Sequence, residues 1–293
     1  MKKILVLSGG GVKGLIQMVA LAKMENALGG QIAKNYDLII GTSAGAINGG
    51  ALALNIMTAN QICNEYPAMI KEIFKRHFWP LTPKYDRQNF IKIWNKKFGN
   101  PQMKDCQIPF ICTSVDRVVD LPRYFKSWEK EDGEENMCEC ICRSFAAPLF
   151  FGQLVDEKNK CVWLDGGCGT DNLPLDEALT ESILQLWFKT EVIQFDIYGT
   201  GFSKEVENFD ECKKGRWLKQ VLDFMKPTDG GMARMMSRQE QLNRLHKICE
   251  TNPTVRMNYY DIEIDKKHDK MDAVDLIDVY IKYGKEVQPI IIK

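Results

Sequence analysis

The segment Gly41-Thr42-Ser43-Ala44-Gly45 constrains the fold more than any other part of this chain. A short apolar run, residues 36–40, comes directly before it, and a stretch of small residues, 46–54, follows directly after it. This order predicts a strand, a tight turn and a helix. A serine at such a turn, between glycines that tolerate strained backbone and leave space around Oγ, is typical of a nucleophile elbow. We therefore predict that Ser43 is a nucleophile, with capping of the helix by its hydroxyl as the structural alternative.

A glycine-rich loop lies upstream of this elbow. Residues 3–7 form an apolar run that predicts a buried first strand, and a helix pattern extends from Leu15 to about Leu28. Between them stand three consecutive glycines, Gly9, Gly10 and Gly11. Such a loop exposes unpaired backbone N–H groups at a helix N-terminus, where the helix dipole adds positive potential. The loop is therefore predicted to bind an anion.

Two kinds of anion suit a loop of this type. In a dinucleotide-binding domain, Gly9, Gly11 and Gly14 would cradle a pyrophosphate, and an acid about 20 residues further on would bind the ribose. The second predicted strand carries no acid at its tip, so this reading is disfavoured. The other anion is the oxyanion of a tetrahedral acyl intermediate, which needs preorganised N–H donors beside the nucleophile. A glycine loop next to an elbow serine meets that need.

A serine nucleophile also needs a base, and the chain has three histidines, His77, His246 and His268. An α/β-hydrolase carries its elbow well into the sheet and its histidine last, whereas Ser43 follows the second predicted strand. His268 lies in a charged run typical of a solvated loop, and His246 lies in a polar helix pattern. Neither is a convincing partner for the serine, so we predict that the base is a carboxylate.

Asp165 is the carboxylate that is easiest to place. It ends the apolar run 161–164 and precedes Gly166 and Gly167. An acid at the carboxyl end of a strand points into the crevice where open α/β sheets carry their active sites. We predict that Asp165 is the base. The alternative is an aspartate that only stabilises its own turn.

Taken together, residues 9–14, 41–45 and 165–167 closely resemble the three signature segments of the patatin-like phospholipase family. Many relatives have an aspartate before the first glycines, where this chain has Ser8. Further segments share the resemblance, which spans nearly the whole chain: 143–148, 172–174, 198–201 and 271–273.

The resemblance implies a serine–aspartate dyad of Ser43 and Asp165 and hydrolysis of acyl esters of phospholipids or lysophospholipids. It implies an oxyanion hole at Gly9, Gly10 and Gly11, and neither metal nor cofactor. Lys13 is expected to have a structural role. The other residues that belong to the resembling segments are Gly14, Gly41, Gly45, Gly166 and Gly167.

The alternation of strand and helix patterns predicts an α/β fold with three layers, a mostly parallel sheet with helices on both faces. No repeat or linker interrupts the chain, so we expect one patatin-like domain over residues 1–293. The predicted strands are 108–115, 123–126, 161–165, 193–200 and 255–264, besides the two near the N-terminus. The predicted helices after the elbow are a helical segment 60–99, one leading to Pro148, and 175–187, 212–225, 232–249 and 272–283. Residues 129–135 are predicted to be a surface loop.

The composition of the chain limits the binding partners and the cellular location that we expect. The formal net charge is zero, so a general affinity for nucleic acid is not expected. The apolar run after Met1 is too short for a signal peptide, and no stretch is long enough to span a membrane, so we expect a cytoplasmic protein. Its ten cysteines are scattered and are expected to be reduced. Cys138, Cys140 and Cys142 lack the partners and the spacing of a metal site, so no metal is predicted there.

Residues 71–104 differ from the rest of the chain in charge. They hold nine basic residues against two acidic ones, together with seven aromatic residues. Basic and aromatic residues together are typical of peripheral contact with an anionic membrane, here at its inner face. The alternative is a solvated helix pair whose aromatic residues face the core.

Two other functional classes stay open from the sequence. One is an effector lipase of the same fold that is inactive until a ligand or partner binds. The other is a non-catalytic module that binds a nucleotide or phosphate at the glycine loop. The sequence does not determine the lipid head group, the acyl position or the oligomeric state.

Overall fold

The strands of the described residues form one nine-stranded sheet in the order β5-β6-β3-β2-β1-β7-β8-β9, with β4 also paired to β3. The computed structural model describes residues 1–76, 82–169, 172–185, 187–203 and 232–290, so the helix predicted at 212–225 lies outside the described residues. The strands are β1 (Lys2–Leu7), β2 (Leu38–Thr42), β3 (Phe110–Asp116), β4 (Leu121–Lys126), β5 (Leu154–Asp156), β6 (Cys161–Asp165), β7 (Ile193–Tyr198), β8 (Val255–Asp261) and β9 (Gln288–Ile290).

The centre of the sheet is parallel. Strands β3, β2, β1, β7 and β8 pair in parallel, whereas β4, β5, β6 and β9 add antiparallel pairs toward the two margins. The innermost strands β1 and β2 contain buried apolar runs because both faces of a parallel sheet are covered. The predicted mostly parallel α/β sheet is confirmed, and the short strands β5 and β9 were not predicted.

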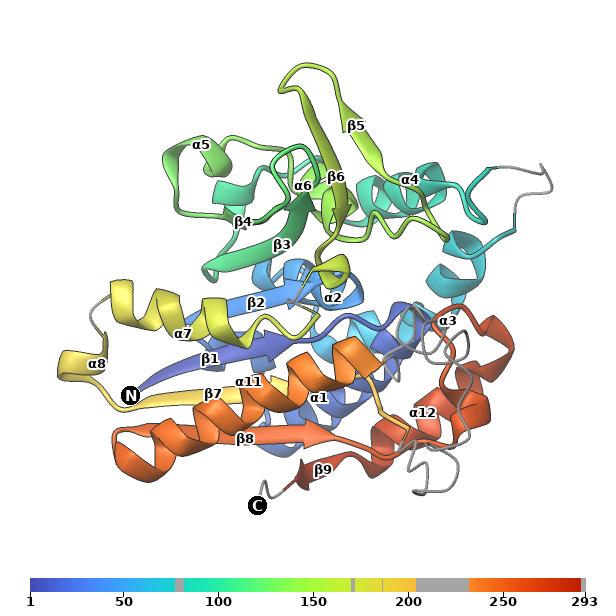
Figure 1. Cartoon of the computed structure of the whole chain (residues 1–293). Coiled ribbons are helices and arrows are strands. Elements are labelled where there is room, and N and C mark those ends of the chain that lie inside the picture. Colours follow the sequence, from blue (N-terminus) through green and yellow to red (C-terminus); the bar gives the residue numbers. More distant parts are fainter. Residues whose placement is uncertain (77–81, 170–171, 186, 204–231, 291–293) are drawn as a thin grey trace, which may run out of the picture.

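Helices cover both faces of this sheet, as predicted (Figure 1). The helices are α1 (Gly14–Leu28), α2 (Ala44–Ala53), α3 (Ala59–Ile73), α4 (Arg87–Phe98), α5 (Lys130–Gly133), α6 (Met137–Ser144), α7 (Leu175–Leu184), α8 (Trp187–Thr190), α11 (Met232–Thr251) and α12 (Ile277–Glu286).

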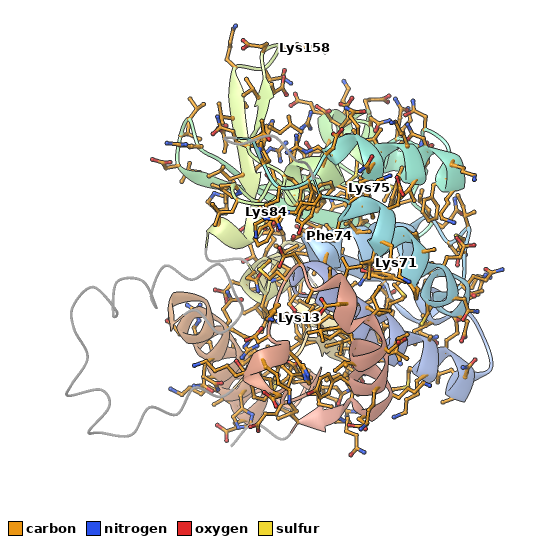
Figure 2. The ribbon with its side chains drawn as sticks, turned by 90° about the vertical axis from the view of Figure 1, so that its right-hand side faces the viewer. Lys13, Lys71, Phe74, Lys75, Lys84 and Lys158 are labelled. Atoms are coloured by element: carbon orange, nitrogen blue, oxygen red, sulfur yellow. The ribbon has the colours of Figure 1, made fainter. Side chains whose placement is uncertain are left out.

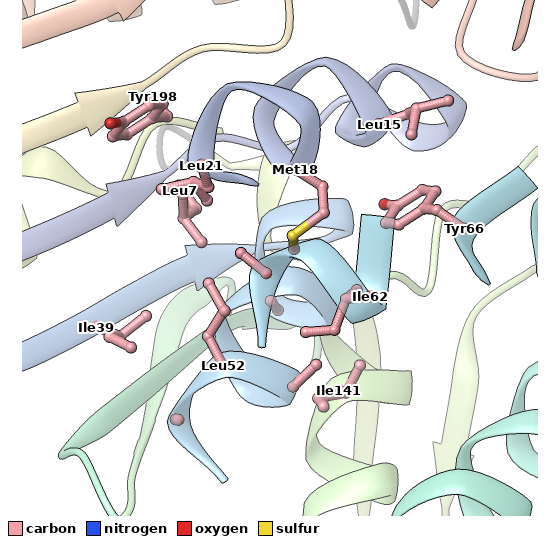
Figure 3. Close-up of a cluster of buried hydrophobic side chains, with 14 of the residues drawn as sticks. Leu7, Leu15, Met18, Leu21, Ile39, Leu52, Ile62, Tyr66, Ile141 and Tyr198 are labelled. Atoms are coloured by element: carbon pink, nitrogen blue, oxygen red, sulfur yellow. The ribbon is translucent and has the colours of Figure 1, made fainter. Parts of the chain in front are cut away.

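Side-chain alternation along the strands divides the core in two. Leu5, Leu7 and Ile39 point into one cluster with residues of α1, α2, α3 and α12, part of which Figure 3 shows. Ile4 and Val6 point into the other cluster, which α7 and α11 close. Because successive side chains of a strand point to opposite faces, one apolar run serves both layers.

Three segments differ from the predictions. The predicted surface loop 129–135 contains the short helix α5, because Asp132 turns inward to pair with Arg123 and to accept the Lys126 N–H at 2.9 Å. The predicted helical segment 60–99 contains two helices, α3 and α4, each with its own N-cap side chain. The last helix starts at Ile277 and not at residue 272, because the preceding residues form contacts with the site described below.

Glu25 links helix α1 to the start of helix α3 and to Ile32. Its carboxylate, at the end of α1, accepts the N–H groups of Ala59 and Asn60 at the start of α3 and that of Ile32. Burial disfavours the charge, but these donors outweigh it and hold the pKa of Glu25 below its usual range. Ionised Glu25 therefore stabilises the fold at neutral pH, and this contribution is lost as the pH falls through the lowered pKa.

We expect Glu25→Gln to reduce the free energy of unfolding at pH 7 by about 1–3 kcal/mol, because buried N–H donors lose a charged acceptor. The difference from the parent should narrow at an acidic pH below the lowered pKa, where the parent carboxylate has taken up its proton. Urea unfolding at both pH values measures this. Glu72→Gln, at an exposed position of α3, is the control and should change stability by less than about 0.5 kcal/mol. An equal deficit at both pH values would contradict the assignment.

Candidate active site

Ser43 lies at a strained turn between β2 and α2. Its backbone has φ 54° and ψ −118°, in a region that non-glycine residues rarely occupy. The turn is possible because glycines allow close approach on either side. A Cβ at Gly41 would lie 2.2 Å from the Gly45 carbonyl oxygen, and a Cβ at Gly45 would lie 2.3 Å from that of Leu7. The predicted strand, turn and helix are therefore present in this structure.

The Ser43 hydroxyl donates to Asp165 Oδ2 at 2.8 Å. The other carboxylate oxygen, Oδ1, accepts the Gly167 N–H at 2.8 Å. The Asp165 carboxylate therefore does both things that were considered from the sequence. One oxygen orders the turn that starts at Gly166, and the other accepts a hydrogen bond from the serine. Both residues are almost fully buried, with exposed fractions of 5% for Ser43 and 4% for Asp165.

Strand β3 brings these two residues together. It pairs in parallel with β2 as far as Thr113, opposite Thr42, and in antiparallel with β6 from Ser114, opposite Asp165. The Thr42 and Thr113 hydroxyls lie 2.7 Å apart across the parallel pair. The end of β2, which delivers Ser43, and the end of β6, which carries the aspartate, therefore lie against consecutive residues of one strand.

The segment after α6 braces both halves of the pair. The Ser144 hydroxyl oxygen accepts the Ser43 N–H at 2.8 Å, and the Ala146 carbonyl oxygen accepts the Asp165 N–H at 3.0 Å. Burial raises the pKa of the neighbouring Cys112 to about 12, so this thiol stays protonated and does not compete as a nucleophile.

The glycine loop differs from the prediction at Gly9. The Gly9 N–H donates to the Asn172 carbonyl oxygen at 2.9 Å, so it is not available to an oxyanion. Within the described residues, the N–H groups of Gly10 and Gly11 donate to no acceptor. The loop is held from outside by the Thr200 hydroxyl, which donates to the Gly9 carbonyl oxygen at 3.1 Å.

Lys13 has the structural contacts expected of it. It is fully buried, and its ammonium group donates to Asp269 Oδ1 at 2.7 Å, while the Ser203 hydroxyl donates to Asp269 Oδ2 at 2.7 Å. Two residues further along, the Met271 carbonyl oxygen accepts the Val12 N–H at 2.8 Å. The segment 269–271 therefore holds the glycine loop from the side of the C-terminal half. Gly14 follows as the first residue of α1.

An apolar pocket opens beside the pair. Ser43, Asp165 and Gly11 contribute to its polar end, and it contains about 650 Å³ of empty space, part of it open to solvent. Burial raises the pKa of Tyr66 above its usual range, so its hydroxyl stays protonated. The other walls come mainly from α3 and the segment after α6: Ile47, Met69, Ile70, Ile73, Phe74, Phe90, Phe145, Ala147, Phe150, Phe151 and Met271.

The two described histidines have their contacts elsewhere. His246 lies on α11 with Nε2 at 3.5 Å from Glu250, and His268 Nδ1 lies 3.0 Å from the Tyr283 hydroxyl. His77 lies outside the described residues. These contacts are consistent with an aspartate base.

The described aromatic residues of 71–104 fall into two groups, and Phe78 and Trp79 lie outside the described residues. Tyr85, Phe90, Trp94 and Phe98 are buried, so the core reading holds for these aromatic residues. Phe74 is partly buried and lines the pocket.

Sequence reasoning did not assign roles to Ser144, Asn172, Thr200 or Asp269. Each acts on the site through one hydrogen bond or ion pair across a large sequence separation. No local spacing marks such a residue. The family resemblance includes the segments that contain Ser144, Asn172 and Thr200, but it predicts no contact for any of these residues.

The strain at Ser43 predicts a difference between two variants that both lack the hydroxyl. Ser43→Gly should be more stable than Ser43→Ala by about 1 kcal/mol, because glycine relieves the positive φ while alanine keeps its Cβ there. Thermal unfolding of the two proteins measures the difference. Ser144→Gly compared with Ser144→Ala is the control, because residue 144 lies in the regular helix α6, where alanine should be the more stable. An alanine advantage at position 43 would contradict a strained elbow.

Comparison with known proteins matches residues 5–179 to the model of the family described as patatin-like phospholipase. The cGAMP-activated phospholipase of Pseudomonas aeruginosa is 30% identical over 181 residues, 56% of this chain and 52% of that protein. Patatin-17 of Solanum cardiophyllum is 27% identical over 173 residues, 52% and 43% of the two chains. The intracellular phospholipase A2 of Caenorhabditis elegans is 26% identical over 214 residues, 67% of this chain and 19% of that protein.

The chain thus spans about half, or less, of the length of these curated relatives. Among solved structures, VipD from Legionella pneumophila aligns with a TM-score of 0.43 at 12% identity, over 99% of this chain and 68% of that one. The matched residues 5–179 include the glycine loop, Ser43 and Asp165. On this match, the chain belongs to the patatin-like phospholipase family.

Proposed function

We propose that this chain hydrolyses acyl esters of phospholipids or lysophospholipids with Ser43 as nucleophile and Asp165 as base. The observation that carries the proposal is the 2.8 Å hydrogen bond from Ser43 Oγ to Asp165 Oδ2 at the polar end of an apolar pocket. An apolar wall suits an acyl chain, and the nucleophile stands where the ester carbonyl of that chain would lie.

In the first half of the reaction, Asp165 accepts the hydroxyl proton while Ser43 Oγ attacks the ester carbonyl carbon. The resulting oxyanion is stabilised by the N–H groups of Gly10 and Gly11, which have no other acceptor among the described residues. Collapse of the intermediate breaks the bond to the alcohol, and Asp165 returns its proton to the leaving oxygen.

In the second half, Asp165 takes a proton from a water molecule, and the hydroxide attacks the acyl–serine ester. The same N–H groups hold the second oxyanion. The bond to Ser43 Oγ then breaks, the serine recovers its proton from Asp165, and the fatty acid leaves. The cycle uses one carboxylate as base and acid in turn, and it requires no metal or cofactor.

A ligand-activated effector lipase is the second candidate. The Pseudomonas aeruginosa relative is named as a cGAMP-activated phospholipase, which supports asking whether a cyclic dinucleotide also activates this chain. Turnover by the purified protein without any addition separates the two candidates. A non-catalytic phosphate-binding module is disfavoured, because Ser43 and Asp165 face each other and the pocket is apolar.

The proposed partner is therefore a membrane lipid or lysolipid and not nucleic acid. No helix in the described part of the chain is long and apolar enough to cross a membrane. A cytoplasmic location with peripheral contact at the inner face of the membrane, and a single domain over residues 1–293, stay predictions.

The first test concerns the dyad. Ser43→Ala should abolish hydrolysis of a short-chain nitrophenyl ester, and Asp165→Asn should abolish turnover while the thermal unfolding curve keeps its cooperative form. The asparagine Oδ1 can still accept the Gly167 N–H, but the amide nitrogen facing Ser43 cannot take up a proton. His246→Gln and His268→Gln are matched controls and should keep parental kcat, and a chelator should change nothing. Near-normal turnover by Asp165→Asn would mean that the base is misassigned.

The second test concerns the glycine loop. A Cβ at Gly10 would lie 2.3 Å from Thr200 Oγ1, so Gly10→Ala must displace the loop and its N–H groups. We expect kcat to fall by about 100-fold or more, the typical cost of one oxyanion donor. The double variant Gly10→Ala with Thr200→Gly, compared with Thr200→Gly alone, should recover part of the loss. Unchanged kcat for Gly10→Ala would show that the loop does not contact the intermediate.

A further inference from the structure

The part of the pocket wall called here the mouth is formed by two segments that lie close together. The turn 147–152, after α6, supplies Phe150 and Phe151 to the pocket wall. The segment before α4 holds this turn: the Tyr85 N–H donates to the Phe150 carbonyl oxygen at 2.9 Å, and the Arg87 guanidinium donates to the Gly152 carbonyl oxygen at 2.7 Å. These hydrogen bonds hold the two segments of the mouth together.

Leu149 projects from this turn into solvent. Its exposed fraction is 62%, although both residues after it line the pocket. The turn is compact, because the Ala147 carbonyl oxygen accepts the N–H groups of Phe150, Phe151 and Gly152 at 2.9–3.0 Å. A large apolar side chain is thus held outward next to two residues that line an apolar pocket, where burial against another apolar phase would remove it from water.

Basic residues flank Phe74, whose ring lies 5.6 Å from that of Phe151 in the turn 147–152. Lys71, Lys75 and Arg76 are exposed at the end of α3, beside the pocket residues Ile73 and Phe74. None of the three forms an ion pair with a carboxylate of the described residues, and Glu72 is the one exposed acid within this turn. Figure 2 shows Lys71 and Lys75 on the face that also carries Phe74 and Lys84.

Lys84 links the basic and apolar parts of the mouth. Its ammonium group lies 4.9 Å from the centre of the Phe150 ring and 3.1 Å from Asp272 Oδ2. Asp272 also accepts the Tyr85 hydroxyl at 2.9 Å. Lys84 is therefore neutralised by Asp272 and serves to order the entrance, whereas Lys71, Lys75 and Arg76 remain as net positive charge.

We propose that Leu149 with Lys71, Lys75 and Arg76, called here the mouth surface, docks on an anionic lipid bilayer. This inference rests on the proposed function and deepens it, because it names the surface from which a lipid enters the site. Leu149 enters the head-group region and the basic side chains lie against anionic head groups. The pocket entrance then faces the acyl chains, which a soluble anionic partner would not supply.

The test measures sedimentation with vesicles in the Ser43→Ala background, so that no lipid is consumed. Vesicles of phosphatidylcholine alone and of phosphatidylcholine with phosphatidylglycerol are compared at low and high salt. Binding should require the anionic lipid and weaken with added salt. Lys71→Gln with Lys75→Gln should lower the partition constant roughly tenfold or more, since each basic residue near the surface contributes about fivefold. Leu149→Ser should lower the partition constant at both low and high salt.

Matched controls lie away from the mouth. Val119 has an exposed fraction of 59%, close to that of Leu149, but lies in the turn between β3 and β4. Lys158 and Lys160 are exposed in the turn between β5 and β6, and Figure 2 shows Lys158 far from Phe74. Val119→Ser, and Lys158→Gln with Lys160→Gln, should bind vesicles as the parent does.

Equal losses for the mouth variants and their controls would overturn the proposal, as would binding that is indifferent to anionic lipid. Loss confined to the lysine pair, with Leu149→Ser unchanged, would also overturn it, because it would show adsorption to the bilayer through charge alone. Hydrolysis of the short-chain ester by the parent is scored separately. Vesicle binding without ester hydrolysis would contradict constitutive turnover and favour the ligand-activated candidate, while the mouth surface would still be supported.

Discussion

The hydrogen bond between Ser43 and Asp165 depends on two strands of opposite direction, β2 and β6, that both pair with β3. This strand pairs in parallel with β2 up to Thr113 and in antiparallel with β6 from Ser114. Parallel neighbours end at the same edge of a sheet, so β2 alone would place a nucleophile there without a partner. The antiparallel β6 approaches from the opposite direction and ends with Asp165 at the same point. The contact between Ser43 and Asp165 is thus a consequence of mixed pairing.

The rest of the site is held by groups that must all be in place at once. The Ser43 N–H, the Asp165 N–H and the Gly9 N–H each donate to an acceptor from another segment. Leaving one of these groups unpaired away from water would cost about 1–3 kcal/mol, which resists local rearrangement. The pairing leaves two N–H groups of the loop, at Gly10 and Gly11, directed to no protein acceptor in the described residues. Preorganised donors of this kind are what an oxyanion requires.

The same logic explains where prediction from sequence failed. Acidic residues 129–135 look solvated in a one-dimensional pattern, yet Asp132 is buried because Arg123 and the Lys126 N–H, from β4, satisfy it. The stretch 272–276 looks like a helix start, yet Asp272 and Met271 form hydrogen bonds with Tyr85 and Val12. In both cases a partner on another element outweighed the local preference.

The sequence by itself determined the parts of this protein whose cause is local. Apolar runs of strand length next to glycine turns predicted β1, β2 and β6, and they predicted Ser43 and Asp165 at the strand ends. Backbone geometry at a glycine turn depends on neighbouring residues, so a short segment is enough to specify it. Tertiary structure decided the rest: that Asp165 meets Ser43, that Gly9 is bonded to Asn172, and that Leu149 is held at the mouth of the pocket. These contacts join segments far apart in the chain, and only the packing of the sheet and its two helical layers fixes which of them meet.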